Sequence, residues 1–132
     1  MTRRSPTLQV LVGKAPSDGR TARVACLIDA GLRTSVVARP ILDQLGLVPG
    51  ELRTICILTN GTGIDRQVAE AYLEVNGRGA TVPVAFGEPG DANLVAGEAL
   101  HAMGWMLHPF TRELLPLNRD ASLSASYSAV AR

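Results

Sequence analysis

The chain has 132 residues, of which 46% are hydrophobic, 19% charged and 4% aromatic, and its formal net charge is +1. This length fits one domain with a sizeable core, and the hydrophobic fraction excludes gross disorder. The small net charge and the scarcity of aromatic residues argue against nucleic acid or a membrane as a partner. No apolar run reaches membrane-spanning length, and Gln9 and Lys14 interrupt any signal-peptide core, so a cytoplasmic protein is expected.

Residues of the types that bind metals or form disulfides are few. Cys26 and Cys56 do not form a CxxC pair, and both lie in strand-like runs, where buried free thiols are expected. His101 and His108 have no acidic or thiol cluster of ligand spacing beside them, so a helix-surface and a loop position are expected for them. We therefore expect no metal ion and no cofactor.

The first third of the chain predicts strands followed by a helix. Runs with strand composition cover residues 7–12, 20–28 and 34–37. Pro40 and Gly46 then mark the start and the end of a helix, because proline tolerates the first helical turn and glycine suits the residue after the last. Ile41 and Leu45 are expected on the buried face of this helix.

The middle of the chain is expected to be a run of antiparallel hairpins. Strands are predicted over residues 51–59, 66–75 and 81–86. In the second of these runs apolar and polar residues alternate, which is typical of a half-buried strand. Asn60, Gly61, Thr62 and Gly63 are predicted to form the tip of the first hairpin, and residues 76–79 a second tight turn.

The last part of the chain predicts a short helix over 97–103 and two closing strands over 105–107 and 114–117. Residues 118–132 are rich in Ser and Ala and have no periodicity, which predicts a flexible C-terminal tail. Residues 1–117 are then a single domain. These elements together predict a mostly β fold, a closed barrel with one or two short helices.

The most informative stretch is residues 26–37, CLIDAGLRTSVV. A strand ends in an acid, two small residues follow, and a second strand begins at Thr34. Gly31 is free to adopt backbone angles that a side chain would forbid, and Asp29 is expected to be held, partly buried, at the edge of a sheet. This position suits a working carboxylate. The alternative is that Asp29 is an ordinary turn-forming or capping residue.

This stretch resembles the active-site loop of the retropepsin-like aspartic proteases, hydrophobic-Asp-Thr/Ser-Gly-Ala-x-x-Ser-Val-hydrophobic. Residues 93–105, NLVAGEALHAMGW, are similar to the segment that closes the same fold, hydrophobic-hydrophobic-Gly-x-x-x-Leu-x-x-hydrophobic-Gly. The small soluble prokaryotic members also have a Phe-Gly-Glu-x-Gly-Asp loop, here residues 86–91. The resemblance covers residues 7–117 and implies a retropepsin-like closed β-barrel, the acid protease fold.

Hydrolysis by carboxylates needs two of them that share one proton, so that one activates a water and the other donates to the carbonyl oxygen. This chain has one candidate, Asp29, since no second Asp-small-Gly turn occurs in it. The resemblance therefore implies an aspartic endopeptidase that acts as a homodimer on a peptide or protein substrate. The Asp29 side chains of the two subunits would meet on the two-fold axis.

The resemblance also assigns roles around Asp29. Ala30, Gly31 and Ser35 belong to the active-site loop, and Ala96 and Gly97 support that loop. Residues 60–63 correspond to the flap, which closes over an extended peptide bound as an added strand. The alternative for residues 60–63 is an ordinary surface hairpin.

The chain departs from the family pattern at three positions. Ala30 replaces a Thr or Ser whose hydroxyl makes a cross-subunit hydrogen bond in the family, Leu32 replaces Ala, and Ala96 replaces Gly. These changes motivate a second hypothesis, a catalytically weakened or inactive retropepsin-fold module for dimerisation or peptide binding. A third hypothesis is a small β-barrel ligand binder in which Asp29 is only a turn residue.

Overall fold

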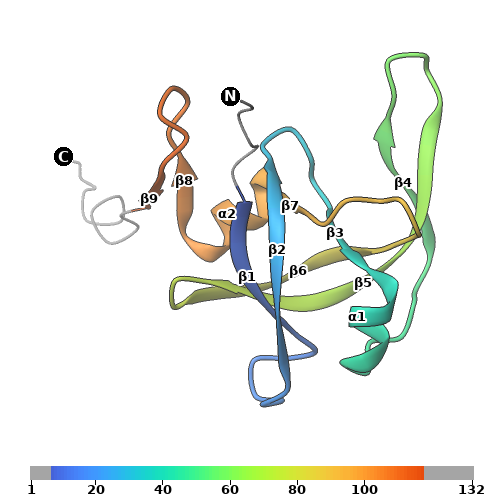
Figure 1. The fold of residues 1–132 in the computed structure, drawn as a ribbon, viewed down its shortest axis with the longest axis horizontal. Helices are drawn as coiled ribbons and strands as arrows, with labels where there is room; N and C mark the ends of the chain where they lie inside the picture. Colours follow the sequence, from blue (N-terminus) through green and yellow to red (C-terminus); the bar gives the residue numbers. More distant parts are fainter. Residues whose placement is uncertain (1–6, 118–132) are drawn as a thin grey trace, which may run out of the picture.

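The computed structural model describes residues 7–117 of the chain (Figure 1). Within them the elements follow in the order β1 (Thr7–Gly13), β2 (Thr21–Asp29), β3 (Ser35–Ala38), α1 (Arg39–Gln44), β4 (Leu52–Ile57), β5 (Gly63–Val75), β6 (Arg78–Gly87), β7 (Leu94–Ala96), α2 (Gly97–Met103), β8 (Trp105–Leu107) and β9 (Leu114–Pro116). No helix in this part of the chain is long and apolar enough to cross a membrane. The tail predicted for residues 118–132 lies outside the described residues.

Seven of the described strands form one sheet in the order β1-β2-β7-β3-β6-β5-β4. A further pairing between β1 and β5, in register from Leu11↔Glu74 to Gly13↔Tyr72, closes the sheet into a barrel that leaves β4 outside as an edge strand. Most neighbours are antiparallel, but β2 pairs with β7, and β3 with β6, in parallel. The predicted mostly β closed barrel with short helices is confirmed.

The core consists of alternate residues of the barrel strands and one face of each helix. Side chains that are at most 1% exposed include Val10, Val12, Leu42, Leu73, Val84, Phe86, Val95 and Leu100. Each such large apolar side chain stabilises the fold by about 1.5–3 kcal/mol. The buried face predicted for α1 is confirmed, since Leu45 is 5% exposed and Ile41 packs against the core.

The turn between β5 and β6 shows why β6 begins earlier than predicted. Asn76 and Gly77 both have positive φ angles, 48° and 84°, which fit a two-residue hairpin turn. Strand pairing therefore continues up to Val75↔Arg78. The predicted turn over 76–79 is too long by the two residues that begin β6.

The structure differs from the predicted elements in the last third of the chain. β7 has three residues and was not among the predicted strands, although its parallel pairing with β2 is central to the barrel. β8 and β9 occur where strands are predicted, but they pair with each other in a separate two-stranded sheet and do not close the barrel. Arg78 and Trp105 anchor this hairpin, since Arg78 donates to Gly104 O (2.9 Å) and Trp105 donates to Val75 O (3.0 Å).

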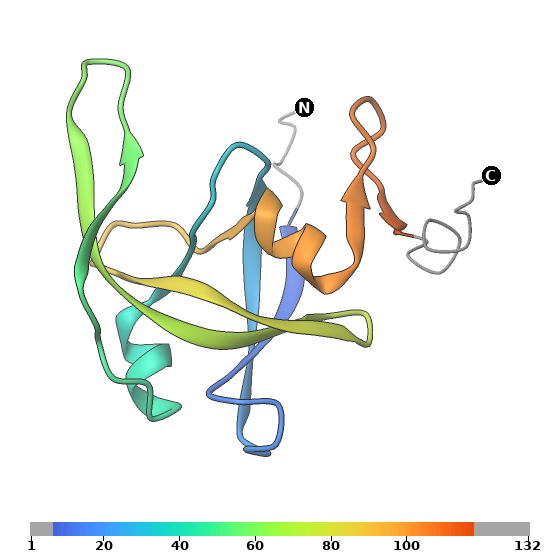
Figure 2. The ribbon, with the colours of Figure 1, turned by 180° about the vertical axis from the view of Figure 1, so that it is seen from behind.

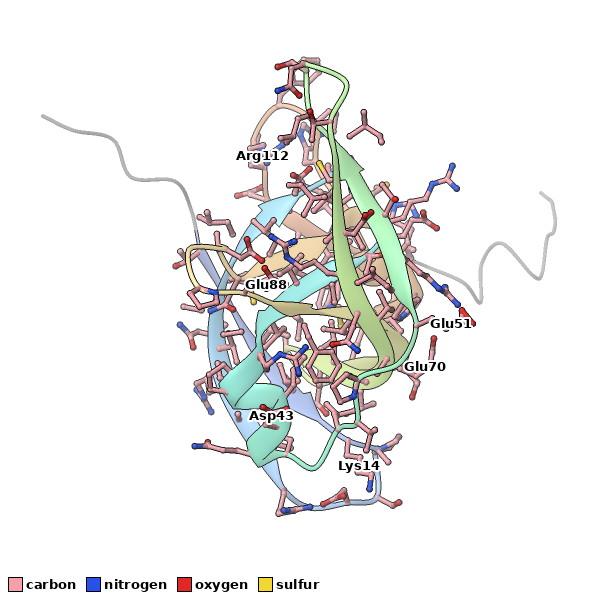
Figure 3. The ribbon with its side chains drawn as sticks, turned by 90° about the vertical axis from the view of Figure 1, so that its right-hand side faces the viewer. Lys14, Asp43, Glu51, Glu70, Glu88 and Arg112 are labelled. Atoms are coloured by element: carbon pink, nitrogen blue, oxygen red, sulfur yellow. The ribbon has the colours of Figure 1, made fainter. Side chains whose placement is uncertain are left out.

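Two hairpins project from the same end of the barrel, β4–β5 on one side and β8–β9 on the other (Figures 1 and 2). The loop that joins β2 to β3 lies between them at this end. Arg112, in the loop between β8 and β9, is labelled near this end in Figure 3, whereas Asp43 and Lys14 lie toward the opposite end. The stretch that resembles an active-site loop is therefore flanked by the two projecting hairpins.

Candidate active site

Asp29 is the last residue of β2 and is half-buried. Its Oδ1 accepts a hydrogen bond from the Gly31 N–H at 3.1 Å, and its backbone oxygen accepts one from the Leu32 N–H at 3.2 Å. These bonds fix the turn in the way expected of a turn-forming aspartate. Within residues 7–117 no group donates a hydrogen bond to Asp29 Oδ2, so this oxygen is available to a water or to a second carboxyl group.

Gly31 does not use the conformational freedom that glycine has at this turn. Within the described residues the glycines with positive φ are Gly19, Gly46, Gly61, Gly77, Gly90 and Gly104. A Cβ atom placed on Gly31 would have its nearest contact at 3.7 Å, with Asp29 Oδ1, which is an ordinary van der Waals distance. The turn is therefore shaped by the hydrogen bonds of Asp29 and does not depend on a glycine in the left-handed conformation.

Glycine is needed at position 97, where α2 approaches the loop after Asp29. A Cβ atom on Gly97 would lie 2.5 Å from the backbone oxygen of Ala30 and 3.1 Å from its carbonyl carbon. Ala96, which stands where the family has glycine, is fully buried and pairs with Asp29 across the parallel strands. The first residue of α2 thus packs directly on the backbone of the loop.

Ser35 connects β3 to β7 beneath this loop. It is fully buried, and its Oγ accepts a hydrogen bond from the Ala96 N–H at 2.9 Å. Asn93 adds a second connection, because its Oδ1 accepts from the Ala38 N–H at 2.9 Å and its backbone oxygen from the Leu27 N–H. Sequence reasoning misses the role of Asn93, since a single Asn in a loop has no pattern that predicts such a bond.

A cavity of about 250 Å³ opens beside Asp29, between the loop and the β4–β5 hairpin. Its walls are mostly apolar and include Leu32, Val36, Ile55, Ile64 and Leu94. Pockets for drug-sized ligands measure about 300–1,000 Å³. The cavity is therefore suited to one amino-acid side chain.

A second, open hollow of about 500 Å³ continues between the loop and β4, lined by residues 31–34 and 53–57. Because β4 is the edge strand of the sheet, one row of its backbone groups has no strand partner in the described chain. An extended peptide can pair with such an edge as an added strand.

The predicted tip of the β4–β5 hairpin is a compact turn. The Leu58 N–H donates to Thr62 O at 2.8 Å, and the Thr62 N–H donates to Asn60 Oδ1 at 2.9 Å. Gly61 has a positive φ of 85°, and Gly63 is already the first residue of β5. The structure thus gathers the loop and its supporting residues at one place and holds the tip apart at the end of a projecting hairpin (Figure 1).

The two cysteines differ in environment. Cys26 is 1% exposed, and burial raises the pKa of its thiol to about 11, which makes it unreactive at neutral pH. Cys56 is half-buried and lines the cavity beside Asp29. Both cysteines are free thiols, as expected. The expected burial is confirmed for Cys26 and wrong for Cys56, because β4 is an edge strand with one side open to the hollow.

Arg66 and Asp91 form an ion pair that joins β5 to the turn between β6 and β7. Arg66 Nε lies 2.7 Å from Asp91 Oδ2, and Arg66 Nη2 lies 3.0 Å from Asp91 Oδ1. These hydrogen bonds, with one from the Glu88 N–H, hold the pKa of Asp91 below its ordinary value of 3.8 despite partial burial. Sequence reasoning misses this pair because its members are far apart in the chain.

The lowered pKa of Asp91 predicts a pH-dependent contribution to stability. A carboxyl group whose pKa is lower in the folded state stabilises the fold above its unfolded-state pKa, and this contribution is lost as the pH falls through the folded-state value. We expect Asp91→Asn to be less stable than the wild type at neutral pH, and the difference to shrink below pH 3.8. Urea unfolding at a series of pH values measures this. A stability difference between Asp91→Asn and the wild type that stays constant into the acid range contradicts this prediction. Asp43→Asn, at an exposed position on α1, is the control.

Comparison with known proteins identifies the fold. No family model matches the chain, and no curated protein sequence matches it. A solved structure, the EIAV protease complexed with the inhibitor HBY-793, is similar with a TM-score of 0.52 and 18% sequence identity. The match covers 76% of this chain and 89% of that protein. The fold is retropepsin-like. At this identity the likeness shows the fold alone, and it confirms the predicted fold class.

Proposed function

We propose that the protein is an aspartic endopeptidase that acts as a homodimer, with the Asp29 carboxyl groups of both subunits at one site. The observation that carries the proposal is the position of Asp29. It ends a strand of a retropepsin-like barrel, with one carboxylate oxygen available, beside a cavity of side-chain size and a hollow along an edge strand. The sequence motif around Asp29 and the retropepsin-like fold both support this function.

The chemistry requires a second carboxyl group from outside the chain. The other carboxylate that lines the cavity is Asp91, which is bound to Arg66 and therefore cannot share a proton with Asp29. When two Asp29 carboxyl groups lie about 3 Å apart, they cannot both ionise. The ionised group takes a proton from the attacking water, and the protonated one donates to the carbonyl oxygen of the peptide. The two pKa values then belong to the pair.

The substrate in this proposal is an extended peptide. Its main chain pairs with the edge of β4, and one of its side chains enters the apolar cavity. The β4–β5 hairpin, with its turn at residues 58–62, acts as the flap. This hairpin already forms one wall of the cavity through Ile55 and Ile64.

Incubation of the wild-type protein with an unfolded protein substrate, from acidic to neutral pH, tests the proposal. We expect cleavage with a bell-shaped pH dependence, because one carboxyl must be ionised and the other protonated. A transition-state inhibitor of aspartic proteases should abolish the cleavage. Absence of cleavage at every pH from a correctly folded dimer contradicts the proposal.

Ala30 favours a second candidate function, a dimerisation or peptide-binding module with weak or no catalysis. Ala30 is exposed on the loop and has no hydroxyl for the cross-subunit bond that the resemblance implies at this position. This module binds peptides in the same cavity without cleaving them. Peptide binding by the wild type without any turnover is the result that favours this function.

Ala30→Thr is expected to strengthen the dimer and raise peptide cleavage. A hydrogen bond contributes about 0.5–1.5 kcal/mol, so two per dimer correspond to a dissociation constant that is lower by a factor of roughly 5 to 150. Sedimentation equilibrium and peptide turnover measure the two effects. Ala30→Val, which has a similar shape and no hydroxyl, is the control, and an equal gain in both variants contradicts the explanation.

A further inference from the structure

The Arg66–Asp91 pair is the least exposed ion pair of the described residues, with 16% of the Arg66 side chain and 24% of the Asp91 side chain exposed. It is bidentate, which is the strongest geometry for this kind of contact. Arg66 also lies 3.8 Å from a carboxylate oxygen of Glu88, whose side chain is 60% exposed. The pair therefore holds two separate segments of the chain together near the barrel surface.

Asp91 is held in place from its own turn as well. Its Oδ2 accepts a hydrogen bond from the Glu88 N–H at 2.8 Å, and its N–H donates to Glu88 O at 2.9 Å. Gly90 has a positive φ of 94°, which closes the turn tightly. Both carboxylate oxygens of Asp91 are thus used, one by Arg66 alone and one by Arg66 and Glu88 together.

This turn forms one wall of the cavity beside Asp29. Gly90, Asp91 and Ala92 line the cavity, and the rest of its lining consists of Asp29, Cys56 and apolar residues such as Leu32 and Ile64. A carboxylate in such a wall would attract a basic side chain strongly, because an opposite charge in a partly desolvated site interacts more strongly than in water. Arg66 removes this attraction, since it already neutralises Asp91.

We propose that Arg66 is a specificity-determining residue, which masks the charge of Asp91 and so makes the cavity select uncharged apolar side chains of the bound peptide over basic ones. This inference rests on the proposed function, because it assumes that a peptide side chain occupies the cavity. Specificity is the difference between the affinities for two ligands, here peptides with an apolar or a basic side chain in the cavity. The basic side chain gains no attraction from Asp91, because Arg66 already pairs with that carboxylate. Arg66 acts through Asp91 and does not touch the reacting atoms.

Arg66→Met tests the inference, because it keeps an unbranched apolar side chain and leaves Asp91 without its partner. The substrates are paired peptides that carry Leu or Lys at each position in turn. The readout is the ratio of kcat/KM for the Lys peptide to that for the Leu peptide, which does not depend on the folded fraction of enzyme. We expect this ratio to rise about tenfold at one position, as one charge-assisted hydrogen bond predicts. An unchanged ratio overturns the inference.

Three further variants separate charge from structure. The double variant Arg66→Met/Asp91→Asn should return the ratio to the wild-type value, since the unpaired carboxylate that Arg66→Met leaves at position 91 is then absent. Arg66→Lys should also keep the wild-type ratio, because the positive charge is retained. Arg20→Met breaks the Arg20–Asp18 pair, which does not line the cavity, and should leave the ratio unchanged. A Lys preference that persists in the double variant overturns the inference.

Binding of the same peptides to Asp29→Asn, with and without Arg66→Met, distinguishes this inference from the proposed function. If the wild type cleaves no peptide but Arg66→Met shifts the ratio of dissociation constants toward Lys, the specificity role stands and the peptidase function fails. If peptides are cleaved, but Arg66→Met shifts neither the Lys-to-Leu ratio of kcat/KM nor that of the dissociation constants, the peptidase function stands and the specificity role fails.

Discussion

Asp29→Asn is expected to lower kcat/KM for peptide cleavage by about 10²–10⁴-fold while the dimer persists. An amide cannot accept the proton of the attacking water, and loss of general acid–base catalysis typically costs about 10²–10⁴-fold. The Asn carboxamide oxygen can still accept the hydrogen bond that Asp29 Oδ1 now receives from the Gly31 N–H, so the turn is retained. Steady-state kinetics and sedimentation equilibrium measure the two quantities.

Asp43→Asn is the matched control, because it makes the same chemical change on α1, toward the opposite end of the molecule (Figure 3). It should cleave peptides at the wild-type rate. Turnover by Asp29→Asn at a rate close to that of the control eliminates the role proposed for Asp29.

Gly97→Ala is expected to lower the free energy of unfolding by about 1–3 kcal/mol, as overpacking of a filled site typically does. The added Cβ would lie 2.5 Å from Ala30 O, and a backbone atom cannot rotate away as a side chain can. The loop that carries Asp29 must move, so peptide cleavage should be lost as well. Urea unfolding and a peptidase assay on the folded fraction measure the two effects.

Gly31→Ala provides the contrast for Gly97→Ala, because both replace a glycine at the same loop. Its Cβ atom would meet only an ordinary contact at 3.7 Å, and its backbone does not require a left-handed conformation. Its stability should stay within about 1 kcal/mol of the wild type, with a gain expected from the lower entropy of the unfolded chain. Equal destabilisation by the two substitutions contradicts the account of the loop.

The architecture was predictable where the signals are local. Asn76 and Gly77 form a two-residue hairpin turn because both tolerate positive φ. Apolar and polar residues alternate along β5, which indicates a strand with one face buried and the other exposed. The helix over Gly97–Met103 has the bounds that the sequence predicts, with Gly104 in the left-handed conformation after it. These features depend on neighbours within a few residues, which is the range that periodicity and turn chemistry describe.

Contacts between distant segments were not predictable in this way. β7 is only three residues long, and its identity as a strand comes from parallel pairing with β2. The glycine requirement falls on Gly97 and not on Gly31, because it arises from the approach of α2 to the loop. Likewise β8 and β9 have strand composition, but nothing local specifies that they pair with each other outside the barrel.

The most direct test of the shared site is a mixing experiment with wild-type and Asp29→Asn subunits. Mixtures at constant total protein are allowed to exchange subunits, and peptide cleavage is measured against the wild-type fraction. If each active site needs an Asp29 from both partners, the rate falls with the square of the wild-type fraction. A rate that falls in direct proportion to that fraction contradicts the account, because each chain would then be active alone.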